Sequence, residues 1–133
     1  MTQISPMLAV SDPAAAIDFY ERAFGAVVRW RIGDPAEVAG LSIEGAEFFL
    51  ARETPSRGTR SPDSVGHTTV RIELFVDDPV AVQRRAIDAG ARAGSEVVEH
   101  THTIVGSPLP MRMLQGGVID PSGHVWLIGR FLE

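Results

Sequence analysis

The stretch RIELFVDDPVAVQRRAIDAG, from Arg71 to Gly90, predicts one strand that leads into one helix. Apolar residues alternate with others over residues 70–76, and a period of two is typical of a strand with one buried face. Asp78 is a good N-cap and Pro79 suits the first helical position. We expect the apolar helix face to continue until Gly90 ends the helix as a C-terminal cap.

A near copy of this stretch, SPMLAVSDPAAAIDFYERAFG, opens the chain at residues 5–25. When the two copies are aligned on their shared Asp-Pro, Ser5 corresponds to Arg71. A second pair of segments, GAEFFLAR at 45–52 and GHVWLIGR at 123–130, follows in the same order. Two correspondences in one order indicate a duplicated module.

The order of signals in each module predicts β-α-β-β-β. We expect the first module over about residues 1–53, a linker rich in Ser, Thr, Pro and Gly over about 54–69, and the second module over about 70–133. The linker is expected to be a surface loop, and the strand after the second helix is expected over 96–105. One helix cannot cover both faces of a four-stranded sheet. We therefore predict a single α+β domain, in which the two modules form a cupped mixed sheet with the helices outside.

The composition excludes several classes of protein. The chain has 133 residues, 44% hydrophobic and 22% charged, which is ordinary for one globular domain. It has no cysteine, so disulfides and thiolate metal sites are excluded. The net charge of −5 argues against a nucleic-acid partner. No apolar run approaches the length of a membrane span, and we expect a cytoplasmic protein.

Two motifs suggest a family. The paired modules, the opening DP-x-x-x-IDFYERAFGA at 12–26 and the closing DP-x-GH-x-W at 120–126 together resemble the vicinal oxygen chelate superfamily. This is the glyoxalase, bleomycin-resistance and extradiol-dioxygenase group, and the small glyoxalase-like proteins within it are the most similar. In its metal-using members, the resemblance implies ligands, usually His or Glu, on the first and last strand of each module.

The residues at these four places do not suit a divalent metal. The repeat alignment puts the ligand positions at Ser5, Phe49, Arg71 and Leu127. Phe and Leu cannot coordinate, a guanidinium has no lone pair to give, and Ser is at best a weak neutral ligand. We expect no metal and no cofactor. A displaced metal site remains an alternative, because His100 and His102 share a strand face and Glu73 or Glu47 could add a carboxylate. The other interpretation is that the two His side chains lie on the exposed face or rim of a strand and bind no metal.

Strand alternation predicts the ligand-binding residues. If the apolar face of residues 70–76 packs under the helix, Arg71, Glu73 and Phe75 point into the concavity. There Arg71 could hold a carboxylate or phosphate, or stack on an aromatic ligand. The alternative is a lateral ion pair between Arg71 and Glu73, since residues i and i+2 are within reach of long side chains.

Other side chains are expected to complete the pocket. The candidates for its walls and base are Met7, Trp30, Phe49, Phe75, Ser5 and Leu127. Arg112 is the second basic candidate, at the pocket rim. Trp126 has the opposite parity to Leu127, so we expect it to face the helices as a structural residue. His124 is expected at the edge, where its motif serves the turn.

Two functions are compatible with this sequence. The first is a metal-free protein that binds a small organic molecule in a sheet-lined pocket, as the drug-resistance members do. The second is a lyase, isomerase or dioxygenase acting on a small oxygen-bearing substrate, which burial of Arg71 and Glu73 would favour. The resemblance also implies a homodimer, which would cover exposed sheet edges.

Overall fold

The computed structural model describes all residues, 1–133. The first half forms a four-stranded sheet in the order β1-β4-β3-β2, with β1 parallel to β4, and we call it the first sheet. Its elements are β1 (Met7–Val10), α1 (Pro13–Phe24), β2 (Val27–Ile32), β3 (Val38–Ile43) and β4 (Ala46–Arg52).

The second half repeats this order in a five-stranded sheet, which we call the second sheet. Strands run in the order β5-β9-β8-β6, with β5 parallel to β9, and β7 also pairs with β8. Its elements are β5 (Arg71–Phe75), α3 (Pro79–Asp88), β6 (Arg92–Ala93), β7 (Val98–His102), β8 (Met111–Ile119) and β9 (Val125–Leu132). No helix is long and apolar enough to cross a membrane.

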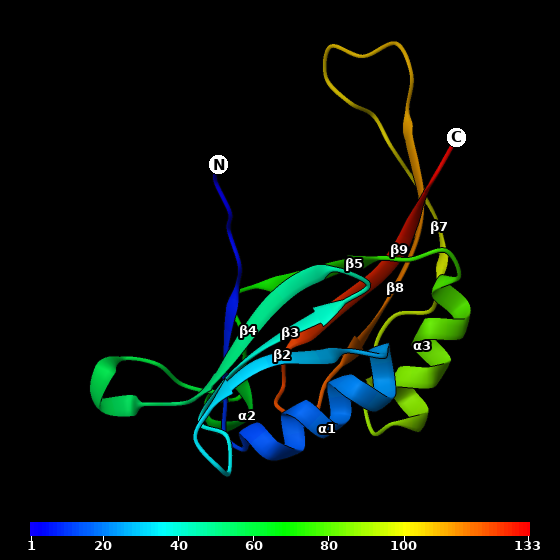
Figure 1. Cartoon of the computed structure of the whole chain (residues 1–133). Coiled ribbons are helices and arrows are strands. Elements are labelled where there is room, and N and C mark those ends of the chain that lie inside the picture. The colour runs from blue at the N-terminus through cyan, green and yellow to red at the C-terminus, as the bar shows by residue number, and fades with distance from the viewer.

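The α+β class and the two βαβββ modules are confirmed. The modules do not join into one hydrogen-bonded sheet, because no strand of the first sheet pairs with a strand of the second. Helices α1 and α3 lie together on one side of the two sheets (Figure 1), and Arg85 Nε donates to the carbonyl of Arg22 across them. We call the side of each sheet that faces away from these helices its open face.

The strand registers agree with the repeat alignment. Met7 lies beside Phe49 in the first sheet, and Glu73 lies beside Leu127 in the second. These two pairs occupy equivalent positions, because the alignment matches Met7 with Glu73 and Phe49 with Leu127. The duplication seen in the sequence is therefore a duplication of strand pairing.

The Asp-Pro pairs start both helices. Asp12 Oδ1 accepts from the backbone N–H of Ala15 at 3.1 Å, and Asp78 Oδ1 accepts from Ala81 at 3.1 Å. Each Asp is the N-cap, and a proline follows at the first helical position, where no amide hydrogen is needed. The helix of the second module, α3, ends one residue earlier than predicted, with Ala89 and not Gly90 as its C-cap.

The strand predicted over 96–105 is wrong in its extent. Within this range the structure has only β7, at 98–102, and the separate strand β6 precedes it; both pair with β8. Between them the backbone passes so close to β8 that a Cβ atom on Gly116 would lie 2.7 Å from the Val97 nitrogen. Only glycine fits there. The register changes because residues 94–97 lie opposite only two residues of β8, 116 and 117. Beyond β7 the chain forms a long loop that projects from the molecule before β8 begins (Figure 1).

The linker is more structured than the predicted surface loop. It contains a short 3-10 helix, η1 (Pro55–Arg57), and a four-residue helix, α2 (Pro62–Val65). The Glu53 carboxylate accepts from the Ser61 backbone, the Ser64 hydroxyl and the Arg60 guanidinium. These local bonds, the Ser61 bond first among them, lower the pKa of Glu53. Ser61 itself is fully buried.

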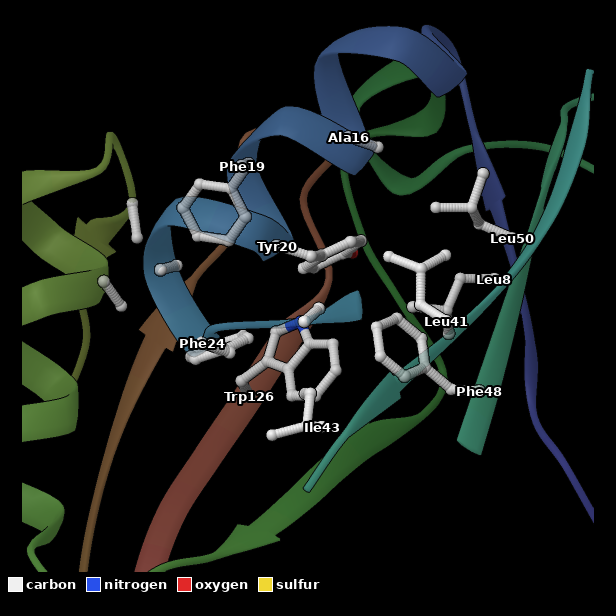
Figure 2. Packing of buried hydrophobic residues seen from close by; sticks show 14 of the residues in the cluster. Leu8, Ala16, Phe19, Tyr20, Phe24, Leu41, Ile43, Phe48, Leu50 and Trp126 are labelled. Atoms are coloured by element: carbon white, nitrogen blue, oxygen red, sulfur yellow. The ribbon is translucent and has the colours of Figure 1, made fainter. Parts of the chain in front are cut away.

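An aromatic cluster from both modules forms the centre of the core (Figure 2). Trp126 on β9 packs against Phe24 with ring centroids 4.8 Å apart, against Tyr20 at 5.4 Å and against Phe48 at 5.5 Å. Trp126 is only 2% exposed, so its predicted structural role facing the helices is confirmed. Phe48 and Trp126 are equivalent in the repeat, and they meet across the boundary between the modules.

The buried carboxyl group of Asp120 connects α1 to the turn between β8 and β9. One oxygen accepts from the Tyr20 hydroxyl and from Trp126 Nε1 at 2.9 Å. The other accepts from the backbone N–H groups of Ser122 at 2.9 Å and His124 at 3.0 Å. Asp120 is 3% exposed, and no buried side-chain nitrogen or oxygen atom lacks a partner.

The motif of His124 serves the turn as predicted, because the His124 backbone N–H donates to Asp120, but His124 is buried and does not lie at the edge. Its side chain is 7% exposed, and Nε2 lies 2.8 Å from the carbonyl oxygen of Ala9 on β1. His124 therefore connects the start of β9 to the free edge of β1. The turn motif positions a contact between modules, which the one-dimensional pattern did not indicate.

Tyr20 should control stability at alkaline pH. The chain has one tyrosine and neither lysine nor cysteine, so Tyr20 is the only side chain whose ordinary pKa lies near 10. Burial, followed by the adjacent Asp120 carboxyl, raises the pKa of Tyr20 well above 10.0. The unfolded chain then loses the phenol proton before the folded one does. We expect the free energy of unfolding to fall by about 1.4 kcal/mol per pH unit above pH 10.

Urea unfolding between pH 7 and 11 measures this slope. Tyr20→Phe should cost about 1.5–3 kcal/mol at pH 7, because it removes a hydrogen bond to a carboxylate, and should abolish the slope. A Tyr20→Phe protein that keeps the alkaline slope would show that another group is responsible.

Candidate binding site

The open face of the second sheet begins with alternate residues of β5. Arg71, Glu73 and Phe75 are exposed, whereas Ile72 and Leu74 are partly buried and pack against the core. The predicted alternation is therefore present, with the polar residues pointing away from the helices. Both charged side chains are exposed, so burial does not favour the enzymatic alternative.

Neighbouring strands extend this face into an open depression of about 560 Å³. Leu127 on β9 lies beside Glu73, and Gln115 and Met113 point to the same side from β8. The principal lining residues are Arg71, Glu73, His102, Met113, Gln115 and Leu127. The depression thus combines charged, amide and apolar groups on one surface.

Of the two charged groups of the depression, only Glu73 has a hydrogen-bond partner. Glu73 Oε1 accepts from Gln115 Nε2 at 2.8 Å. The Arg71 side chain forms no hydrogen bond and no ion pair with any residue of the chain. The alternative of a lateral Arg71–Glu73 pair is therefore not what the structure contains. Gln115 holds the carboxylate and leaves the guanidinium without a partner.

Gln115 was missed by the sequence analysis. It has the same strand parity as Met111 and Met113, so its direction could have been inferred from the pattern. Its partner could not, because the hydrogen bond to Glu73 spans 42 residues of sequence.

The open face of the first sheet presents an aromatic pair, with Glu47 farther along β4. Trp30 on β2 packs over Phe49 on β4 with ring centroids 5.2 Å apart. The indole lies directly above Gly40, where a Cβ atom would be 2.3 Å from the indole nitrogen. Neither aromatic residue lines the depression that contains Arg71. Met7 lines a separate groove of about 540 Å³ between β1 and β5.

Three other predicted residues lie apart from Arg71. Ser5 precedes β1 and accepts a hydrogen bond from Gln3 Nε2 at 3.2 Å. Phe75 stacks on Phe131 at 4.7 Å and lines a crevice beside the β3–β4 hairpin. Arg112 points to the opposite side of β8, where it binds Glu99 at 2.9 Å. Their hydrogen bond lowers the pKa of Glu99 and raises that of Arg112.

The alternative of a displaced site with two His and one carboxylate is not assembled. His100 and His102 do share a face, with parallel rings whose centroids are 6.3 Å apart. However, no group of three or more His, Asp or Glu side chains is placed to hold one metal ion. Glu73 is already bound to Gln115.

Comparison with known proteins gives concordant matches. The model of a family described as "Glyoxalase-like domain" matches residues 6–128. An uncharacterised protein of Mycobacterium tuberculosis is 37% identical over 133 residues, covering 96% of this chain and 73% of its own. The structure of TioX from Micromonospora sp. ML1 is similar with a TM-score of 0.69, 26% identity and coverage of 99% and 100%. A bleomycin-binding protein solved with bleomycin has a TM-score of 0.62, 19% identity and coverage of 98% of both chains.

Because Arg71 has no partner within the chain, Arg71→Ala should change the free energy of unfolding by less than about 0.5 kcal/mol. Urea unfolding measures this change. A loss above about 1 kcal/mol would mean that Arg71 stabilises the fold, and would remove the reason to regard it as a free binding group.

Proposed function

This chain belongs to the glyoxalase-like domain family of the vicinal oxygen chelate superfamily, and on that premise we propose that it binds a small organic molecule on the open face around Arg71. The single observation that carries the proposal is the unpartnered guanidinium in an open depression. An arginine there can form two parallel hydrogen bonds to a carboxylate or phosphate, or stack on an aromatic ring. We therefore propose an anionic or aromatic ligand.

The surroundings of Arg71 support this chemistry. The Gln115 amide holds Glu73, which limits competition between the Glu73 carboxylate and a bound anion. Leu127 and Met113 supply apolar surface beside the charged group. Ligand sites of this kind combine apolar walls with a few polar groups that fix orientation.

We further propose that this binding needs no divalent metal. The four positions where metal-using relatives keep ligands are occupied here by Ser5, Phe49, Arg71 and Leu127. None supplies an imidazole or a carboxylate. A positive guanidinium can hold a ligand oxygen, as a metal does, without acting as a Lewis acid. The bleomycin-binding protein supports the proposal at the level of the fold, because that protein holds a drug.

We also propose that the chain forms a homodimer. We regard the two modules as one domain, because they share one core cluster. The open faces still expose large apolar side chains, among them Trp30, Phe75 and Phe131. The edge strand β2 also has only one strand partner. Exposed apolar surface and free edges both favour association. In such a homodimer, the aromatic face of one copy would cover the polar face of the other.

Thermal-shift screening of carboxylates, phosphates and aromatic acids should find a ligand. Calorimetry with that ligand should then show binding weakened about ten- to a hundredfold in Arg71→Ala, with Arg71→Lys intermediate because it keeps the charge but loses the fork geometry. Arg112→Ala is the matched control, because this arginine lies on the opposite side of the sheet and should not affect binding. EDTA treatment should also leave the affinity unchanged.

Equal binding by wild type and Arg71→Ala would contradict the assignment of Arg71. Loss of binding with EDTA, or turnover of the ligand with an added divalent metal, would instead favour the enzymatic alternative.

Light scattering at micromolar concentration should give twice the 14.3 kDa mass of one chain. A particle of 14.3 kDa at every concentration would contradict the homodimer, while leaving Arg71 binding to be judged separately.

A further inference from the structure

Two histidines and two methionines face the same side of the β7–β8 hairpin. In the antiparallel register, His100 lies opposite Met113, and His102 lies opposite Met111. Side chains directly opposite one another share a face, with Cβ atoms about 4.5–5.5 Å apart. The intervening Arg112 points to the other side, where it binds Glu99. The hairpin therefore presents two imidazoles and two thioethers as one cluster.

The cluster is graded from buried to exposed. Met113 is only 5% exposed, His100 and Met111 are half-buried, and His102 is exposed at the start of the projecting loop. His102, Met111 and Met113 all line the open depression. An ion could therefore reach the half-buried thioether of Met111, and then the buried one of Met113, past the exposed imidazole of His102.

The histidines are prepared to act as ligands. His100 Nε2 lies 3.2 Å from the carbonyl oxygen of Gln115. When Nε2 carries the proton and donates to this carbonyl, Nδ1 keeps a free lone pair, and the bond holds the ring orientation. Metal-binding histidines are typically held by such a bond from their second nitrogen. His102 has no hydrogen-bonding partner in the chain, so both of its ring nitrogens are accessible.

These four ligands, two imidazoles and two thioethers, select a soft monovalent ion. Thioether sulfur is soft and uncharged, and it favours Cu(I), whereas Zn²⁺, Mn²⁺ and Mg²⁺ prefer harder ligands or thiolate. None of the four side chains carries a negative charge to neutralise a second positive charge, and the Glu73 carboxylate in the same depression already accepts from Gln115. Arg71 lines the same depression, and its repulsion of a divalent ion is twice that of a monovalent ion at equal distance. We propose that His100, His102, Met111 and Met113 form a Cu(I) site.

This site is distinct from the positions where metal-using relatives bind divalent ions. It uses none of the residues at those positions, which lie on β1, β4, β5 and β9 or just before them. It shares Met113 with the surface proposed for the organic ligand, but no bound organic molecule is needed to complete its ligand set.

Silver is a suitable probe, because Ag(I) has the softness and charge of Cu(I) without its redox chemistry. Calorimetric titration of the intact protein with Ag(I), and titration with Cu(I) under anaerobic reducing conditions against a chromogenic chelator, should each give one ion per chain. Met111→Leu and Met113→Leu remove sulfur with little change in volume. Each should weaken binding by at least the ten- to hundredfold that loss of a supporting outer residue costs at metal sites.

Matched controls separate the cluster from other potential ligands. Met7→Leu and His67→Ala remove the same functional groups elsewhere and should leave silver binding unchanged. Arg71→Ala should keep or strengthen it, because it removes a positive charge. Excess Zn²⁺ should not compete.

Methionine methyl NMR gives a reading that does not depend on the affinity of variants. Of the four methionine signals, only those of Met111 and Met113 should shift on adding one equivalent of Ag(I). Absence of one-to-one binding, or unchanged binding by the Met111→Leu, Met113→Leu double variant, would overturn the proposal. Since Arg71→Ala tests the organic ligand and these variants test the ion, either proposal can fail alone.

Discussion

The position of the two modules relative to each other depends on the four hydrogen bonds accepted by the buried carboxyl group of Asp120. The donors are the hydroxyl of Tyr20 on α1, the indole of Trp126 on β9, and two backbone amides of the β8–β9 turn. A buried carboxyl is costly unless all its acceptor positions are satisfied, so the groups around it are constrained together. One helix of the first module is thereby held against the last hairpin of the second.

This constraint also positions the candidate site. Since Trp126 must point toward Asp120 and the helices, its neighbour Leu127 must point to the open face. β5 runs parallel to β9 with Glu73 beside Leu127, so Arg71 and Glu73 emerge on the same face. The direction of the binding residues is thus a consequence of core packing on the other side of the same sheet.

The two modules keep one backbone plan but have diverged in chemistry. Met7 and Phe49 supply apolar side chains to the open face of the first sheet, and their counterparts Glu73 and Leu127 belong to a mixed polar face on the second sheet. Duplication retains strand pairing because backbone hydrogen bonds do not depend on the side chain. The open faces are free to differ because they do not contribute to the shared core.

Local signals in the sequence determined the repeat, both helix starts and the direction of most strand residues. Asp12 and Asp78 cap helices through bonds only three residues long. Tertiary structure alone decided what each side chain meets. The crowding over Gly116, the burial of His124 and the Gln115–Glu73 bond all join segments that are distant in sequence. Periodicity reports the side of a strand to which a residue points. The residue that it contacts on that side is set by how separate elements pack.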